Sequence, residues 1–257
     1  MKRLSYSFQT RVEFDAPVED HEFVLRCLPG SDATQSVIGQ LELDPSTDVT
    51  LQHDGFGNAI AVGYLEDPHD HFYYRAFGTA TVDQARAMPC EAHPMYRFAS
   101  PMAKMSPAMK EFLAQHPAAE GATELQRCQE LSHLVHEELE YHPGSTSVAT
   151  TAAEAFEQKM GVCQDYAHIL IALLRAEGIS ARYASGLTLG QGMTHAWVQT
   201  HIDGCWRSFD PTRDKPVDDG YLVIAVGRDW SDCPIERGTF QGLSNQTQTI
   251  YMQVKEE

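Results

Sequence analysis

Three short segments of this 257-residue chain carry side chains that could work together as a nucleophile and its base. They supply a thiol, an imidazole and a carboxylate, and they are Gly161-Val162-Cys163-Gln164-Asp165, Thr194-His195-Ala196-Trp197 and Ser208-Phe209-Asp210-Pro211-Thr212. A thiol has an ordinary pKa of about 8.5 and becomes a better nucleophile where a helix N-terminus and an imidazolium favour the thiolate. We therefore expect Cys163, His195 and Asp210 to form a relay for attack on a carbonyl carbon.

A buried helix is predicted to carry the thiol. The run CQDYAHILIALLRAE from Cys163 to Glu177 is apolar on most faces, and Gly178 is a suitable C-cap. Cys163 would then lie in the first turn, where free backbone N–H groups and the helix dipole favour negative charge. The same N–H groups could receive a developing oxyanion.

A hairpin is predicted to bring the imidazole and the carboxylate together. Strand-like runs cover residues 196–202 and 206–209, and Asp203-Gly204 supplies a turn between them. His195 then starts one strand and Asp210 ends the next. When His195 and Asp210 lie side by side, the carboxylate can accept a hydrogen bond from one ring nitrogen and leave the other nitrogen facing the thiol.

The remaining chain predicts a β region, then helices, then strands, which is an α+β arrangement. Residues 1–81 alternate polar and apolar side chains, with a tight turn at Asp54-Gly55-Phe56-Gly57-Asn58. Helical patterns follow at 107–115, at 123–141 with Thr123 as N-cap, and at 151–159, which begins at Thr150 or Thr151 and stops by Gly161. Further strands are expected at 181–189, 221–226 and 249–254.

Composition excludes several classes of partner. The formal net charge is −17, of which −12 falls in residues 1–150, and no basic run exists to neutralise a nucleic acid or an anionic membrane. No apolar run approaches the roughly 18 residues of a membrane span, so we expect a cytoplasmic protein. Its edge strands would allow it to pair with a second copy.

The cysteines and histidines do not form metal-binding patterns. The six cysteines lack a CxxC pair and are expected to be reduced, and no HExxH motif occurs among the twelve histidines. We therefore expect neither a metal nor another cofactor. Apart from Cys163, the cysteines are expected to be small core residues, at positions 27, 90, 128, 205 and 233.

An ordered set of motifs resembles bacterial transglutaminase-like proteins. It comprises DGFGN (Asp54–Asn58), YHPG (Tyr141–Gly144), Thr150-Thr151, GVCQDYAH (Gly161–His168), ARYASG (Ala181–Gly186), HAW (His195–Trp197), FDPT (Phe209–Thr212) and AVGRDWSD (Ala225–Asp232). The resemblance implies a papain-like core at 101–257, preceded by a β-sandwich-like domain at 1–100. It also implies that Cys163 is the nucleophile, His195 the general base and acid, and Asp210 the orienting residue. One departure concerns the turn after FDPT, where Arg213-Asp214 replaces the Asn-Gly of many relatives.

The expected activity is cysteine-dependent hydrolysis of a peptide or side-chain amide through a thioacyl-enzyme. Transfer of the acyl group to a primary amine is the first alternative, because the intermediate does not decide what attacks second. A binding module that keeps the fold without the chemistry is another alternative.

Each residue near the triad has a functional and a structural interpretation. Gln164 could donate to an oxyanion, and Trp197 and Trp206 could line the site, although each also suits a structural place. Asp165 is expected to stabilise the first helical turn. The charged members of AVGRDWSD are expected to brace the hairpin through ion pairs.

Overall fold

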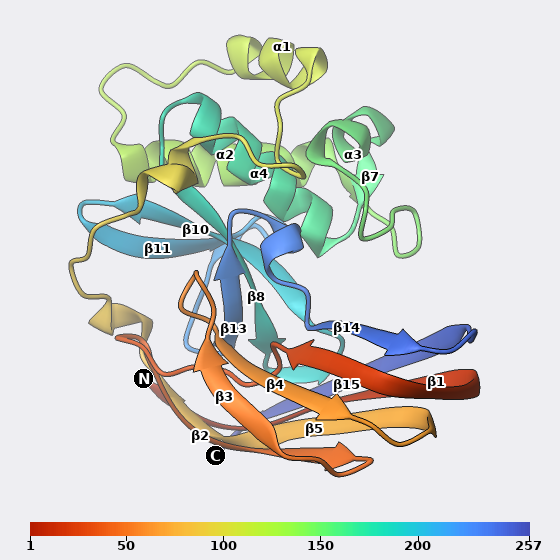
Figure 1. Cartoon of the computed structure of the whole chain (residues 1–257). Helices are drawn as coiled ribbons and strands as arrows, with labels where there is room; N and C mark the ends of the chain where they lie inside the picture. Colours follow the sequence, from red (N-terminus) through yellow and green to blue (C-terminus); the bar gives the residue numbers. More distant parts are fainter.

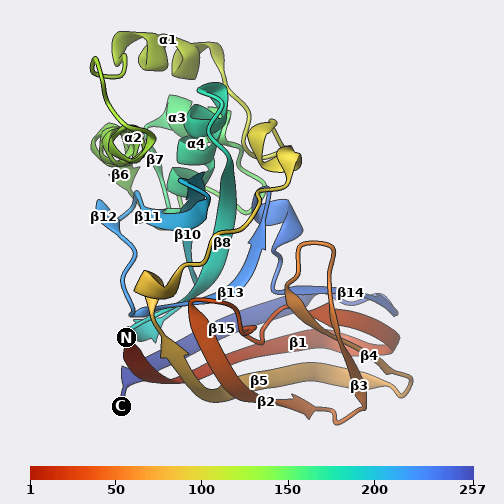
Figure 2. The ribbon, with the colours of Figure 1, turned by 90° about the vertical axis from the view of Figure 1, so that its left-hand side faces the viewer.

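The computed structural model describes all 257 residues and contains an antiparallel β domain and a layered α+β core (Figure 1). In Figure 1 the core lies above the β domain. Figure 2 shows the same layers from the side, with helices at the top, a smaller sheet below them and a larger sheet at the bottom. The predicted α+β class is confirmed.

The larger sheet has eight strands, and its main path runs β2-β5-β1-β15-β9. β4 and β14 also pair with β1, and β3 pairs with β4. The strands are β1 (Lys2–Leu25), β2 (Gln35–Asp44), β3 (Val49–His53), β4 (Ala59–Leu65), β5 (His69–Val82), β9 (Gly190–Gly192), β14 (Glu236–Gln241) and β15 (Gln246–Glu256).

β1 organises this sheet because it is long enough to pair with different neighbours along its two halves. Its first half lies between β5 and β15, and its second half lies between β4 and β14. The register to β5 shifts between Glu13 and Val18, which is the kind of irregularity that bends a strand. Alternate side chains of the first half, beginning with Leu4, Tyr6 and Phe8, are buried, as the alternating pattern predicts.

The predicted domain boundary differs from the structure at the C-terminal end. Residues 101–257 are predicted to form one domain, but β14 and β15 return to the β domain and pair with β1. The strand pattern at 249–254 predicts that this segment is extended, yet strand pairing is non-local and its partner cannot be read from the segment itself.

In the core, α2 and α4 pack against a five-stranded sheet of order β12-β11-β10-β8-β13, α3 packs on α4, and α1 packs on α3. α4 contacts β8 and β10 of this sheet and also α2 and α3. The elements of the core are α1 (Pro107–Gln115), α2 (Glu124–Glu138), β6 (Glu140–Tyr141), α3 (Ala152–Gln158), β7 (Met160–Gly161), α4 (Cys163–Ala176), β8 (Ala181–Thr188), β10 (His195–Ile202), β11 (Cys205–Asp210), β12 (Lys215–Pro216) and β13 (Tyr221–Gly227). Three 3₁₀ turns complete the chain, η1 (Gln84–Arg86), η2 (Pro94–Arg97) and η3 (Trp230–Asp232).

The helix ends follow the capping residues of the sequence. Thr123 and Thr151 each accept a hydrogen bond from the backbone N–H three residues later, in reciprocal capping boxes. α3 ends earlier than predicted, because Lys159 adopts a left-handed conformation with φ of 57°.

None of the helices has the length and apolar character that a membrane-spanning helix needs.

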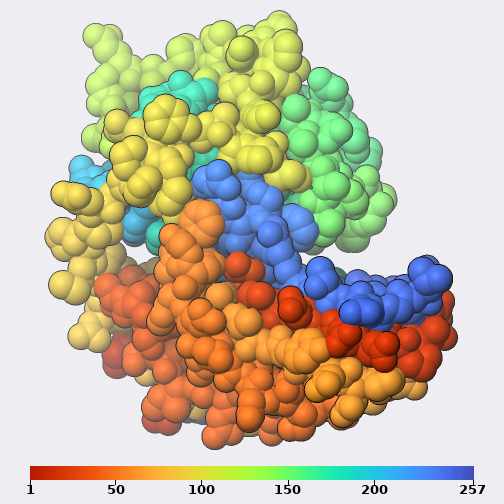
Figure 3. Space-filling view, in the orientation of Figure 1, coloured from red at the N-terminus to blue at the C-terminus, as the bar shows by residue number.

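Two buried side-chain amides join the β domain to the core. Asn58 bonds both the N–H and the carbonyl of Val226 at 2.7 and 2.8 Å, and Gln35 does the same for Val223 at 2.9 and 2.8 Å. Both target residues lie on β13, so the β domain holds this strand of the core sheet. The β domain and the core also share one hydrophobic cluster. On one side of the molecule, Figure 3 shows a hollow between the green segment around residue 150 and the blue segment that contains β14.

Candidate active site

Cys163 occupies the first position of α4, where the sequence predicts it. Its side chain is partly buried, so the thiol is sheltered but accessible. Backbone N–H groups in the first turn have no carbonyl one turn earlier to bond, and the helix dipole adds partial positive charge there. This position could stabilise an oxyanion formed next to it.

Asp165 stabilises the first turn of α4, as expected from the sequence. Its Oδ2 accepts the N–H of Val162 at 2.8 Å and the hydroxyl of Thr146 at 2.7 Å. The carboxyl is fully buried, and this burial raises its pKa. A Cβ atom at Gly161 would lie 2.7 Å from Asp165, so only glycine fits there. Asp165 thus ties the loop that contains Thr146 to the helix that carries the nucleophile.

The hairpin of β10 and β11 brings His195 to Asp210. Val198 pairs with Phe209 in this hairpin, and Asp203-Gly204 makes the turn with φ of 50° and 76°. Nε2 of His195 donates to Oδ2 of Asp210 at 2.7 Å. That bond leaves Nδ1 to face the thiol, and Cys163 is near enough to the ring to raise the pKa of His195. The structure therefore brings together the three side chains that the sequence predicts as a triad.

The protonation of His195 is set by these two partners. Burial alone would lower the pKa of the imidazole, but the hydrogen bonds to Asp210 and to Cys163 outweigh burial and raise the pKa to about 9. Burial alone would raise the pKa of Asp210, whereas the bonds from His195 and Tyr221 and the charge of Arg213 lower it overall.

Two further side chains near Asp210 are absent from the sequence prediction. The hydroxyl of Tyr221 donates to Oδ2 at 2.6 Å, and Arg213 donates to the Tyr221 oxygen at 3.0 Å. Tyr221 lies on β13, two strands away from β10 in the sheet. A Cβ at Gly186 of β8 would lie 2.1 Å from the backbone oxygen of Leu222 and 2.7 Å from the Trp197 ring, so only glycine fits there. No local motif connects Tyr221 to Asp210, although the Arg213 departure marks this turn as unusual.

The three additional site candidates have different surroundings. Trp197 is fully buried and stacks on His195, with ring centroids 6.3 Å apart. Trp206 instead packs against Tyr96 and lies 4.0 Å from the guanidinium of Arg182, towards the turn of the hairpin. The Gln164 amide donates to the carbonyl of Val148 at 3.3 Å. Of these three, Trp197 is the one whose ring packs on the imidazole of the predicted triad.

The charged residues of AVGRDWSD brace a loop rather than the His195–Asp210 hairpin. Asp229 is fully buried and accepts the N–H groups of Met102 and Ser231. Arg228 forms an ion pair with Asp232 at 2.8 Å. These bonds fix η3 and the segment around Met102, so the structure gives this motif a structural place away from the hairpin.

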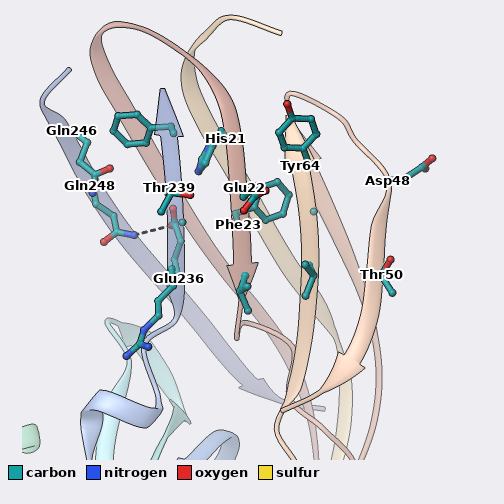
Figure 4. Close-up of a pocket in the computed structure, with 16 residues that line it drawn as sticks. His21, Glu22, Phe23, Asp48, Thr50, Tyr64, Glu236, Thr239, Gln246 and Gln248 are labelled. Carbon is teal, nitrogen blue, oxygen red and sulfur yellow. Dashed lines mark hydrogen bonds between the residues drawn. The ribbon is translucent and has the colours of Figure 1, made fainter. Parts of the chain in front are cut away.

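A large cavity lies in the β domain, away from the triad. It encloses about 1010 Å³, and none of its 16 lining residues belongs to the predicted site. Figure 4 shows His21 and Glu22 of β1 beside Thr239 of β14 on its wall. His21 forms a stacked pair with His69 of β5, and the two rings share a 3.1 Å hydrogen bond. The described residues contain no group of three His, Cys, Asp or Glu side chains that could hold a metal ion.

Comparison with known proteins agrees with this architecture. Residues 4–81 match the bacterial transglutaminase-like N-terminal region, and residues 112–211 match the transglutaminase-like superfamily. The chain is similar to the crystal structure of a candidate cysteine protease from Cytophaga hutchinsonii, with a TM-score of 0.82 and 21% identity over 99% of this chain and 90% of that one. At this identity the match establishes the fold.

Two mycobacterial relatives carry no assigned activity. An uncharacterized protein of Mycobacterium leprae is 38% identical over 114 residues, which cover 40% of this chain and 40% of that protein. An uncharacterized protein of Mycobacterium tuberculosis is 27% identical over 250 residues, covering 79% of this chain and 76% of that protein. The chain thus matches less than half of the first relative's length and about three quarters of the second's.

Proposed function

We propose that this chain, which joins a bacterial transglutaminase-like N-terminal region to a transglutaminase-like core, hydrolyses an amide bond of a peptide or protein substrate. Cys163 is the nucleophile, His195 the general acid and base, and Asp210 the residue that orients the imidazole. The observation that carries the proposal is the 2.7 Å bond between His195 and Asp210, with the Cys163 thiol at a helix N-terminus within reach of the same ring.

The first half of the reaction forms a thioester. The Cys163 thiolate attacks the carbonyl carbon, and the negative charge moves to the carbonyl oxygen, which the N–H groups at the start of α4 can stabilise. The imidazolium of His195 then donates its proton to the amide nitrogen while the C–N bond breaks. The amine leaves, and the acyl group stays on the sulfur.

The second half releases the acyl group. His195, now neutral, removes a proton from water, and the hydroxide oxygen attacks the thioester carbon. The C–S bond breaks, the product leaves as a carboxylic acid, and the thiolate is restored beside the protonated imidazole. Asp210 keeps the same ring nitrogen engaged throughout, so the other nitrogen serves both proton transfers.

A screen of peptides and amides by mass spectrometry tests this proposal. Cys163→Ala should lower kcat/KM by on the order of 10³-fold or more, since the covalent path is lost. Cys205→Ala is a matched control because Cys205 is also partly buried but lies outside the triad, and it should keep wild-type activity. Unchanged turnover in Cys163→Ala would exclude the thiol mechanism.

Competition between water and an amine tests the second half. Wild-type protein is incubated with a glutaminyl protein and a labelled primary amine, and release of ammonia is compared with incorporation of the label. Hydrolysis predicts that most turnovers release ammonia without label. Efficient incorporation would instead identify acyl transfer to amines as the reaction of the thioacyl-enzyme.

Alkylation tests the nucleophile without a substrate. Iodoacetamide near neutral pH should label Cys163 faster than the other five cysteines, because its position favours the thiolate. If labelling of Cys163 is no faster than that of Cys205, and no substrate is turned over, a binding module that retains the fold is the better description.

A further inference from the structure

The carboxylate of Asp210 is fully buried and is held by four donors. Its Oδ1 accepts the backbone N–H groups of Thr212 and Arg213 at 3.1 and 3.2 Å. Its Oδ2 is shared, because it accepts both from Nε2 of His195 at 2.7 Å and from the hydroxyl of Tyr221 at 2.6 Å. Any change in how Tyr221 donates therefore acts on the same oxygen that holds the imidazole.

Arg213 connects this oxygen to the neighbouring strands. Its guanidinium donates to the Tyr221 oxygen at 3.0 Å and to the hydroxyl of Thr188 at 3.2 Å. Thr188 and Tyr221 are partners in the register between β8 and β13, so one guanidinium bridges a cross-strand pair. A cation that donates to a phenol oxygen withdraws electron density from it and makes the O–H a stronger donor.

We propose that Tyr221 and Arg213 form a positioning pair for the triad, in which Tyr221 shares Oδ2 of Asp210 with His195 and Arg213 sets how strongly Tyr221 donates. The pair fixes the plane of the carboxylate and draws charge from the oxygen that faces the imidazole. It thereby limits how tightly His195 holds its proton, so that the proton can be passed on. The catalytic part of this inference rests on the proposed function, whereas its effect on the titration of His195 does not.

Charged and titratable groups approach His195 from several elements. Cys163 comes from α4, Asp210 from β11, Arg213 from the turn after β11, and Tyr221 from β13. Burial and the neighbouring Cys163 raise the pKa of Tyr141 on β6. Among these groups, Arg213 and Tyr221 are the ones that act on His195 through Asp210 without a bond to the imidazole. Removing either one should leave more charge on Oδ2 and raise the pKa of His195.

Tyr221→Phe and Arg213→Gln test the pair. Each should lower kcat by about tenfold with little change in KM, the loss expected for one hydrogen bond that orients a reacting group. Each should also move the alkaline limb of the kcat/KM profile to higher pH. Arg213→Lys retains the positive charge and should restore the position of that limb. In the double variant the two shifts should add only in part, because Arg213 acts both through Tyr221 and through its own charge, 3.8 Å from Oδ2 of Asp210.

Matched controls come from elsewhere in the chain. Arg228→Gln removes a guanidinium that is 40% exposed, against 42% for Arg213, and Tyr74→Phe removes a buried hydroxyl that has no hydrogen-bond partner. Neither should move the alkaline limb. Circular dichroism and thermal melting of each variant identify those that fail to fold.

Titration of His195 by imidazole NMR, together with the pH dependence of Cys163 alkylation, applies even if no substrate is found. A higher His195 pKa in Tyr221→Phe and in Arg213→Gln supports the pair. An unchanged His195 pKa in both variants overturns it, whether or not kcat falls, because the two side chains then only fill space. If the pKa rises but no amide is hydrolysed, the positioning pair stands and the proposed function fails.

Discussion

Two buried histidines, one in each part of the molecule, show how a neighbour decides what an imidazole can do. His195 in the core and His21 in the β domain both lie on strands and are 9% and 2% exposed. The pKa of His195 is raised to about 9, whereas burial and the neighbouring His69 lower the pKa of His21 to about 4. Burial opposes the charged form at both sites, so the difference comes from the partner.

The partner of His195 is a carboxylate, and the partner of His21 is a second imidazole. His69 can only donate from Nδ1 to the carbonyl of Asp67, at 2.9 Å, so its Nε2 accepts from Nδ1 of His21. In this chain of bonds His21 has no anionic partner to stabilise an added proton. At His195 the anionic partner stabilises the proton that catalysis needs.

Replacing each histidine should give the largest contrast. His195→Gln should lower kcat/KM by about 10²- to 10⁴-fold, the usual contribution of a general acid and base. His21→Asn should keep kcat/KM near wild type, because His21 lies in the β domain and bonds His69. Steady-state kinetics on the same substrate compare the two. A large loss of activity in His21→Asn at unchanged stability would mean that the β domain takes part in the reaction.

Removing the charge of Asp210 should lower the pKa of His195 towards that of His21. Asp210→Asn keeps an oxygen that can accept from His195 but loses the negative charge. We expect the pKa of His195 to fall and kcat/KM to fall by on the order of 10²-fold, because the imidazolium loses its stabilising partner. NMR titration of His195 measures the first effect. A pKa that stays near the wild-type value would show that Cys163 alone holds the proton.

The pH dependence of unfolding should show opposite signs for the two sites. His21 has a lowered pKa, so the unfolded chain binds more protons between pH 6.5 and about 4, and stability falls by at most about 3 kcal/mol as pH drops through that range. His195 has a raised pKa, so its contribution is complete below about pH 6.5 and is lost as pH rises through about 9.

Denaturant titrations across these two pH ranges separate the contributions. His21→Asn should flatten the acid side of the stability profile and leave the alkaline side unchanged. His195→Gln should do the reverse. If His21→Asn leaves the acid slope intact, another buried group, such as His168 with its pKa lowered to about 4 by burial, accounts for it.

The aromatic neighbours of the two rings should give the smallest effects. Trp197 stacks on His195, whereas Phe14 and Phe72 meet His21 edge-on. Trp197→Phe should lower kcat/KM by roughly three- to tenfold, because a smaller ring holds the imidazole less firmly. Trp206→Phe is the matched control and should change kcat/KM less than about twofold. Equal losses in both variants would argue for a general effect on the sheet.

The helices and the turns could be predicted because their signals are local. Thr123 and Thr151 cap helices through residues three positions away, and Gly178 supplies the positive φ of 80° that ends α4. The Asp203-Gly204 turn and the alternation around it predict the β10–β11 hairpin. From that hairpin and the helix at Cys163 one can predict which three side chains would meet.

Pairings across long distances in the chain could not be predicted in the same way. β14 and β15 pair with β1, more than 200 positions earlier, and neither segment by itself identifies that partner because strand pairing is non-local. The place of Trp206 depended on Tyr96 and Arg182, which lie on other segments.

The sequence by itself determined the chemical groups of the site and the local elements that carry them, since capping, turn formation and hairpin closure involve residues close together in the chain. Only the tertiary structure decided the electrostatics of each buried group. The side chains around His195 and His21 come from distant strands. At His195 the charge of the partner outweighs the cost of burial, whereas at His21 the neighbouring His69 adds to that cost. Tyr221 reaches Asp210 for the same reason, because the order of the strands in the core sheet sets that contact.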